Sequence, residues 1–191
     1  MNSEQKWIVG LAAGLAAGYA ASQVARARRA IDFGGRVVLI TGGSRGLGLI
    51  LARKLAVEGA RLVLLARDER ELDRAKRMLE EAHRAEVMAI RCDVRDKADV
   101  AAAVEEVLAA WGAVDVLINN AGVITVAPME EMTLADYDEA MQTHFYGPLY
   151  TTLAVLPALL RAAVLTEPAG PRELAGLRPD RHAPLQIRQS E

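Results

Sequence analysis

The chain carries one glycine-rich stretch whose residue types and spacing could hold a phosphate. In TGGSRGLG, residues 41–48, the glycines Gly42, Gly46 and Gly48 follow the pattern G-x3-G-x-G directly after the apolar run RVVLI. Glycine permits a tight turn and lets backbone N–H groups approach an anion, and a helix that begins there adds the positive end of its dipole. Because the stretch stands between a predicted strand and a predicted helix, it indicates a pyrophosphate-binding turn.

Two arginines indicate which dinucleotide such a turn would hold. Arg67 comes 19 residues after Gly48, at the end of the next apolar run, RLVLLA. An acidic residue at this place would accept a hydrogen bond from a ribose 2′-hydroxyl, whereas an arginine suits a 2′-phosphate. Arg45, inside the turn, adds a second positive charge. The pattern favours NADP, and Asp68, one position after Arg67, keeps NAD as the alternative.

Strands and helices alternate along the chain in an order that would bring such residues together. Short apolar runs predict strands at 36–40, 61–66, 86–92 and 114–118. Helical spacing predicts helices over 46–58 (marked by Leu47, Ile50, Leu51 and Leu55), over 69–85 (with Leu72, Ala75, Leu79 and Ala82 facing inward), up to Trp111, and from about 133 to 160. The alternation predicts an α/β fold, a Rossmann-like doubly wound parallel sheet of about four strands that is incomplete. Ligands of such sheets bind at the carboxyl ends of the strands, where the glycine turn and Arg67 lie.

Two further motifs follow the third and fourth predicted strands. They are CDV, residues 92–94, and NNAG, residues 119–122. Together with TGGSRGLG, in this order, they resemble the short-chain dehydrogenase/reductase family, over roughly residues 36–160. The resemblance implies hydride transfer between a nicotinamide and a carbonyl or alcohol. It also implies that Asn119 braces the sheet.

The same resemblance assigns the cofactor-binding residues, and no residue is predicted to bind a metal. The pyrophosphate and adenosine phosphate would be held by Gly42, Ser44, Arg45, Gly46, Leu47 and Gly48, the 2′-phosphate by Arg67, the adenine by Asp93 and Val94, and the ribose by Asn120, Ala121 and Gly122.

The sequence departs from the family at the residues that transfer protons. The resemblance implies a Tyr-x3-Lys pair, a serine upstream of it and an asparagine in the long helix. Tyrosines stand only at 19, 137, 146 and 150, and lysines only at 6, 54, 76 and 97, so no Tyr-x3-Lys pair exists. His144 takes the place of the asparagine, and we expect it to pack against the sheet rather than to relay protons. We assign no catalytic residue and expect the chain as written to be inactive.

Residues 161–191 are predicted to form an irregular or disordered tail. Pro168, Pro171, Pro179 and Pro184 would interrupt any regular element, and no aromatic residue occurs from Ala162 onward. A composition rich in Arg, Pro and Ala is what a GC-rich gene gives when it is read out of frame. If the reading frame over the codons for PLQIRQS, residues 184–190, is moved forward by one base, the shifted frame can encode a tyrosine followed four positions later by lysine or arginine. A frameshift product is one hypothesis, and a natural truncation or a divergent tail are the alternatives.

Residues 1–30 are predicted to form an apolar helix that anchors the chain in a membrane. The segment from Trp7 to Ala25 carries no charge, and as a helix it is long enough to cross the hydrocarbon core. Arg26, Arg28 and Arg29 follow, which by the positive-inside rule places the NAD(P)-binding domain, residues 34–160, in the cytoplasm. A cleaved signal peptide and a soluble leader are the alternatives.

Composition narrows the remaining classes of function. The net charge of −2 gives no indication of a nucleic acid partner. The single cysteine, Cys92, excludes an intrachain disulfide and is expected to be a buried residue at a strand end. No lysine follows the glycine turn, which argues against a P-loop enzyme. Two functions remain: an NADP-dependent oxidoreductase with an unknown carbonyl or alcohol substrate, and a membrane-tethered NADP(H)-binding module without catalysis.

Overall fold

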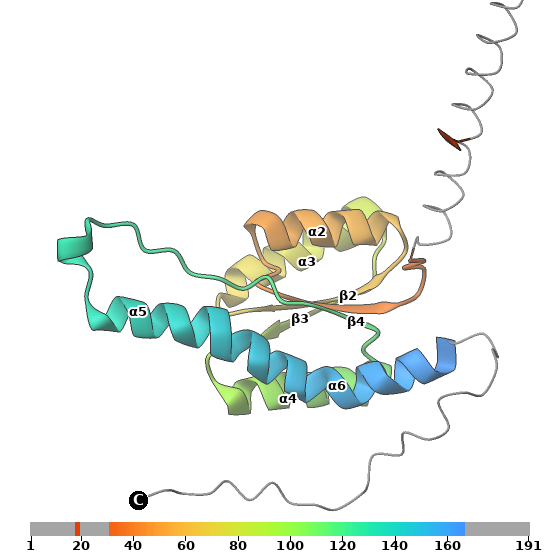
Figure 1. Cartoon of the computed structure of the whole chain (residues 1–191). Helices are drawn as coiled ribbons and strands as arrows, with labels where there is room; N and C mark the ends of the chain where they lie inside the picture. The colour runs from red at the N-terminus through yellow and green to blue at the C-terminus, as the bar shows by residue number, and fades with distance from the viewer. Residues whose placement is uncertain (1–17, 20–30, 167–191) are drawn as a thin grey trace, which may run out of the picture.

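A parallel sheet lies between two layers of helices (Figure 1). The computed structural model describes residues 18–19 and 31–166. The strands β1 (Val37–Thr41), β2 (Arg61–Ala66), β3 (Val87–Arg91) and β4 (Val116–Ile118) pair in parallel in the order β3-β2-β1-β4. The predicted α/β class and the four-stranded Rossmann-like sheet are confirmed.

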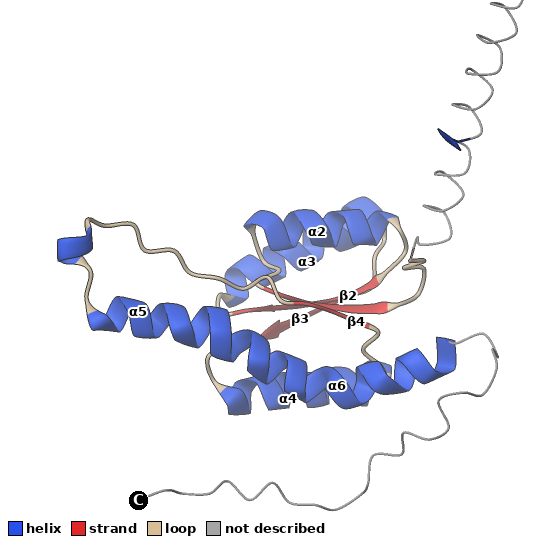
Figure 2. Cartoon of the chain, viewed as in Figure 1, coloured by secondary structure: helices blue, strands red, loops and turns tan. Residues whose placement is uncertain are grey.

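Helices cover both faces of this sheet (Figure 2). The helices α2 (Gly46–Val57) and α3 (Glu69–His83) lie on one face, and α4 (Lys97–Trp111) and α6 (Gly147–Thr166) lie on the other. Along β1, Val38 and Ile40 pack toward α2 and α3, whereas Val37 and Leu39 pack toward α4 and α6. All four side chains are buried, which explains why the strand reads as a continuous apolar run rather than an alternating one.

Two helices bury somewhat different residues from those that the spacing predicts. In α2 the buried residues are Gly48, Ala52, Leu55 and Ala56, while Leu47 and Ile50 are largely exposed. In α3, Leu72, Ala75 and Leu79 are buried as predicted, but Ala82 is exposed. Ala82 lies in the last turn, just before the helix ends at the left-handed residue Arg84, so the inward prediction for Ala82 was wrong.

The predicted long helix from 133 to 160 is a helical run with an interruption. It begins with a capping box between Thr133 and Asp136 and comprises a short helix α5 (Leu134–Met141), a π-helical turn at Gln142–Tyr146, and α6. The helix continues through residues 161–166, whose sequence RAAVLT contains neither proline nor glycine. The tail predicted to be irregular from 161 therefore starts inside α6, and its remainder, 167–191, lies outside the described residues.

The predicted N-terminal anchor also lies outside the described residues, apart from positions 18–19. Within the described ranges, no helix is both long and apolar enough to cross a membrane.

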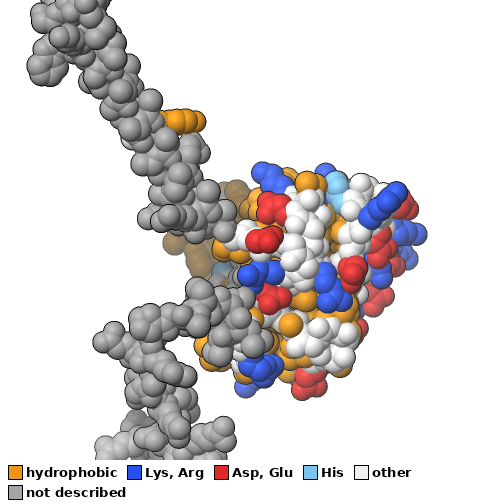
Figure 3. All heavy atoms as spheres, turned by 90° about the vertical axis from the view of Figure 1, so that its right-hand side faces the viewer, with side chains coloured by type: hydrophobic (Ala, Val, Ile, Leu, Met, Phe, Trp, Pro, Cys, Tyr) orange, Lys and Arg blue, Asp and Glu red, His pale blue; other side chains and the backbone are white. Residues whose placement is uncertain are grey.

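Acidic and basic side chains are interspersed on the face of the described residues that Figure 3 shows. Such a mixture of signs is typical of a solvated surface and differs from the basic stripe of nucleic-acid-binding domains.

Candidate functional site

A cavity of about 910 Å³ lies where the carboxyl ends of the four strands meet. Its lining comes from the last residues of β2, from the segments that follow β1, β2, β3 and β4, and from Thr143 of the π-helical turn. Small-molecule sites in proteins commonly measure about 300–1,000 Å³. In the order β3-β2-β1-β4 the chain reverses direction across the sheet between β1 and β4, which is where doubly wound sheets bind ligands.

The structure brings the predicted cofactor-binding residues together around this cavity, with one exception. Gly48 does not line it; an ideal Cβ there would overlap the carbonyl oxygen of Gly42 and lie 2.6 Å from Nδ2 of Asn120. Gly48 therefore lets α2 pack directly beneath the turn. The other predicted residues all line the cavity, and their contact with a cofactor stays a prediction: Gly42, Ser44, Arg45, Gly46, Leu47, Arg67, Asp93, Val94, Asn120, Ala121 and Gly122.

In the glycine turn, the N–H groups of Gly42 and Gly43 donate to the carbonyl oxygen of Leu65, so the N–H groups available to a ligand are those at the start of α2, where Gly46 and Leu47 line the cavity. Gly42 and Gly46 have positive φ angles of 66° and 56°, and a Cβ on Gly42 would lie 2.9 Å from the Cα of Ala121. The first residue of α2 follows Arg45, whose side chain makes no capping hydrogen bond, and the first turn holds no acidic residue. The N-terminal N–H groups of α2 therefore lack a side-chain partner, and together with the helix dipole they fit an anion such as a pyrophosphate.

Thr41 and Asn120 join the ends of β1 and β4 beneath the cavity. The Thr41 Oγ1 accepts hydrogen bonds from the backbone N–H groups of Asn120 and Ala121, both at 3.0 Å. The Asn120 Nδ2 donates to the carbonyl oxygens of Thr41 at 3.0 Å and Gly42 at 3.2 Å. The amide of Asn120 is thus committed to fixing the turn. Asn119 braces the end of β4 against α6 instead, through the hydroxyls of Thr151 at 2.6 Å and Thr152 at 3.2 Å.

Charged side chains gather where β2 ends and α3 begins. Arg67 is exposed at the cavity. Asp68 is the N-cap of α3, and its Oδ1 accepts a hydrogen bond from the backbone N–H of Glu71 at 3.0 Å. The Oε2 of Glu71 accepts a hydrogen bond from the Ser44 hydroxyl at 3.1 Å, and its Oε1 lies 3.6 Å from an Nη of Arg45. Sequence reasoning missed Glu71, although the N-cap pattern of Asp68 places the first turn of α3 beside Arg67.

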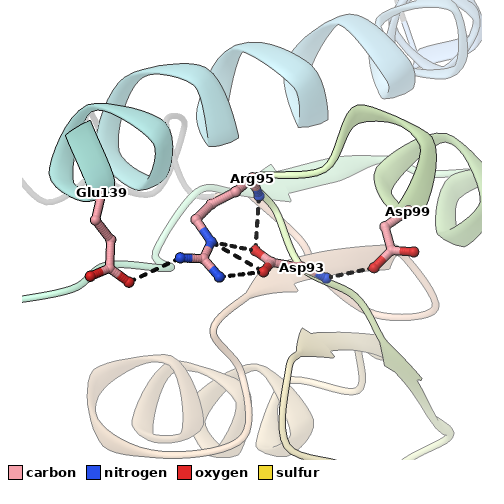
Figure 4. A network of polar contacts seen from close by, with 4 residues as sticks. All are labelled: Asp93, Arg95, Asp99 and Glu139. Carbon is pink, nitrogen blue, oxygen red and sulfur yellow. Dashed lines mark hydrogen bonds and ion pairs between the residues drawn. The ribbon is translucent and has the colours of Figure 1, made fainter. Parts of the chain in front are cut away.

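A second network connects the loop after β3 to α5 (Figure 4). The guanidinium of Arg95 contacts both carboxylate oxygens of Asp93, at 2.7–3.1 Å, and donates to Glu139 of α5 at 2.9 Å. The Asp99 carboxylate accepts a hydrogen bond from the Asp93 backbone N–H at 3.1 Å. Hydrogen bonds from Arg95 lower the pKa of Asp93, which therefore stays ionised at neutral pH. Sequence reasoning also missed Arg95, because a charged loop residue has no periodic signal.

His144 occupies a different environment from the predicted one. Its side chain is exposed, and Nε2 lies 2.8 Å from the carbonyl oxygen of Val123, in the chain that leaves β4. The prediction that it packs against the sheet was wrong, because the π-helical turn at 142–146 changes which side chains face the core. A Cβ on Gly122 would lie 3.0 Å from Cε1 of His144, so the imidazole packs against Gly122, while His144 itself is outside the cavity lining.

Cys92 is a core residue, as predicted. It is 1% exposed, and burial together with the neighbouring carboxylates of Asp99 and Asp93 raises the pKa of its thiol to about 12. A thiol with this pKa is a poor nucleophile at neutral pH.

Comparison with known proteins agrees with this geometry. The family described as short chain dehydrogenase matches residues 36–164. The 11-beta-hydroxysteroid dehydrogenase A of Sesamum indicum is 37% identical over 129 residues, which cover 67% of this chain and 37% of that protein. The alcohol dehydrogenase of Thermococcus sibiricus, solved in complex with 5-hydroxy-NADP, is 33% identical with a TM-score of 0.64, covering 66% of this chain and 54% of that one. A metagenomic short-chain oxidoreductase solved in complex with NADP is 38% identical with a TM-score of 0.64, covering 69% and 60%.

The chain thus spans 37% to 60% of the length of these proteins. The family match covers the whole sheet, the glycine turn and the helices on both faces. The chain belongs to the short-chain dehydrogenase/reductase family.

Proposed function

We propose that the chain is the NADP(H)-binding part of a short-chain dehydrogenase/reductase-type oxidoreductase. The observation that carries this proposal is the distribution of charge around the cavity. The uncapped N-terminus of α2 faces it, Arg45 and Arg67 line it, and the Asp68 carboxylate is engaged as the N-cap of α3. Because Asp68 caps α3, Arg45 and Arg67 are the charged side chains that would face the adenosine ribose of the dinucleotide. This favours a ribose with a 2′-phosphate over one with a bare 2′-hydroxyl. The NADP-bound solved relatives support the same choice.

Each segment of the cavity has a task in this proposal. The N–H groups at the start of α2, which ends the glycine turn, hold the pyrophosphate, and Arg45 and Arg67 bind the 2′-phosphate. Asp93, held ionised by Arg95, accepts a hydrogen bond from the adenine amino group. The chain at Ala121 and Gly122 borders the ribose, at a position fixed by Thr41. The nicotinamide, when bound, supplies a hydride to a carbonyl or takes one from an alcohol.

We further propose that the 191-residue chain binds the cofactor without turning over a substrate. The printed sequence holds no Tyr-x3-Lys pair, and in the described part of the chain the cavity lining contains neither a tyrosine nor a lysine. This observation favours the second candidate function, an NADP(H)-binding module, which the apolar segment from Trp7 to Ala25 would tether to a membrane. Turnover of carbonyl compounds by the purified chain would contradict this part of the proposal.

Cofactor binding is the experiment that tests the main proposal. The full chain is titrated with NADPH and with NADH, and the fluorescence of the reduced nicotinamide is followed. We expect NADPH to bind at least about tenfold more tightly, since a charged, partly desolvated contact is worth about 1.4 kcal/mol or more. Arg67→Gln should remove most of this difference, whereas Arg70→Gln, on the exposed surface of α3 outside the cavity lining, should leave it unchanged. Equal affinity for the two dinucleotides would refute the NADP assignment, and binding of neither would refute the cavity as a dinucleotide site.

A further inference from the structure

One acidic side chain reaches the phosphate-binding end of the cavity. Glu71 lies in the first turn of α3 and lines the cavity together with Ser44, Arg45 and Arg67. Its carboxylate accepts the Ser44 hydrogen bond at 3.1 Å with one oxygen and lies 3.6 Å from Arg45 with the other. A single carboxylate therefore engages two neighbouring residues of the glycine turn.

The two partners of Glu71 differ in their freedom to move. The Arg45 side chain is 80% exposed, whereas the Glu71 side chain is 26% exposed and Ser44 is buried. An exposed arginine reorients toward a ligand at little cost, because its ion pair is weakened by solvent. The Glu71 carboxylate is held by the buried Ser44 hydroxyl, and its negative charge stays beside the turn when Arg45 turns away.

We propose that Glu71 determines how strongly this site prefers the 2′-phosphate, by competing for Arg45 and by repelling the phosphate. This inference rests on the proposed NADP(H) site. A phosphate monoester carries a charge of about −1.5 to −2 at pH 7, so a carboxylate beside it weakens its binding. A ribose that bears only a 2′-hydroxyl brings no charge and is not repelled. Glu71 thus holds the affinity for the phosphorylated dinucleotide below the value that Arg45 and Arg67 alone would give.

The test compares two variants of the full chain that remove one carboxylate from the same turn of α3. Glu71→Gln removes the charge beside Ser44 and Arg45, whereas Glu69→Gln removes a charge that lies outside the cavity lining of the described residues. The probes are NADPH, NADH, 2′,5′-ADP and 5′-AMP, whose dissociation constants are measured by calorimetry. We expect Glu71→Gln to bind NADPH and 2′,5′-ADP about three- to tenfold more tightly, and NADH and 5′-AMP within about twofold of the unsubstituted chain. Glu69→Gln should change none of the four values by more than about twofold.

A double-mutant cycle shows whether Glu71 acts through Arg45. In the Arg45→Gln background, the gain from Glu71→Gln should shrink, because one of the two effects of the carboxylate is gone. Equal gains from Glu71→Gln and Glu69→Gln would overturn the proposal in favour of a general charge effect. A loss of NADPH affinity in Glu71→Gln, with an unchanged thermal unfolding midpoint, would overturn it by showing that Glu71 positions Arg45 for the phosphate. Failure of the unsubstituted chain to bind either dinucleotide is a separate result, and it would overturn the proposed function and this inference together.

Discussion

Replacing Thr41 with valine should destabilise the chain because two backbone donors lose their acceptor. Thr41 is 2% exposed, and its Oγ1 accepts hydrogen bonds from the N–H groups of Asn120 and Ala121, both at 3.0 Å. Valine has nearly the same shape, so packing in β1 is kept while both accepted hydrogen bonds are removed, together with the long 3.5 Å hydrogen bond that Oγ1 donates to the Ile118 carbonyl oxygen. The substitution therefore isolates the polar link between the ends of β1 and β4.

The size of the effect follows from the surroundings of those two donors. An unsatisfied buried donor costs about 1–3 kcal/mol, and because Asn120 and Ala121 are half-buried we take the lower part of this range for each. The free energy of unfolding should fall by about 2–3 kcal/mol in Thr41→Val. The matched control is Thr41→Ser, which keeps the hydroxyl and deletes one buried methyl group, at a cost of about 1 kcal/mol.

Urea denaturation followed by far-ultraviolet circular dichroism measures both values on the full chain. Thr41→Val should unfold at a lower urea concentration than Thr41→Ser, with an unchanged slope. NADPH affinity should also fall in Thr41→Val, because Ala121 would no longer be held at the cavity. If Thr41→Val is as stable as Thr41→Ser, the two hydrogen bonds do not hold the strand ends together and the reasoning is refuted.

Three further outcomes follow from the same structure. Gly48→Ala should abolish NADPH binding and lower the free energy of unfolding by more than about 2 kcal/mol, because the new Cβ would overlap the Gly42 carbonyl oxygen. The control is Gly112→Ala at the end of α4, where φ is 76° and no atom lies near the new Cβ; it should cost about 1 kcal/mol and leave NADPH binding unchanged. Arg95→Met should lower the free energy of unfolding most above pH 5, where Asp93 is ionised in both the folded and the unfolded chain. This loss of stability should shrink as the pH falls through the folded-state pKa of Asp93, which lies below its ordinary value. A loss of stability that stays constant between pH 3 and 7 in chemical denaturation would contradict this. Cys92 should resist a thiol reagent at pH 8 in the native chain and react after addition of urea, and fast reaction of the native chain would show that the thiol is accessible.

The sequence predicts the sheet well because β1 and β2 are uninterrupted apolar runs bounded by polar turns. It predicts the faces of the helices less well. The spacing of Leu47 and Ile50 indicates a helix, but the face of α2 that packs on the sheet carries Gly48 and Ala52, since small residues allow a close approach. The helical spacing of apolar residues is judged mainly from large side chains, even where small residues make the contact between helix and sheet.

The cavity was predictable in outline, since its residues follow strands that must end at one edge of the sheet. Its charged neighbours were not. Glu71 contacts Ser44, 27 positions away, and Arg95 contacts Glu139, 44 positions away, in addition to its neighbour Asp93. Only the folded sheet brings the two distant partners close. The exposure of His144 depends on a π-helical turn, for which the sequence has no recognised signal.

The central position of β1 in the sheet has a consequence for the order in which the chain assembles. One side of β1 pairs with β2 after a short loop-helix connection, but the other side pairs with β4, whose residue Val116 lies opposite Val38. During synthesis, β1 to β3 can form a sheet once residue 91 has emerged from the ribosome, while the free edge of β1 stays unpaired until β4 has emerged. Until the segment up to about 124 has emerged and docked, that edge is open to pairing with other chains. The pairing of β1 with β4, which completes the cavity, is therefore the last of the sheet to form. Before it forms, the nascent chain is most exposed to misassembly through the free edge of β1.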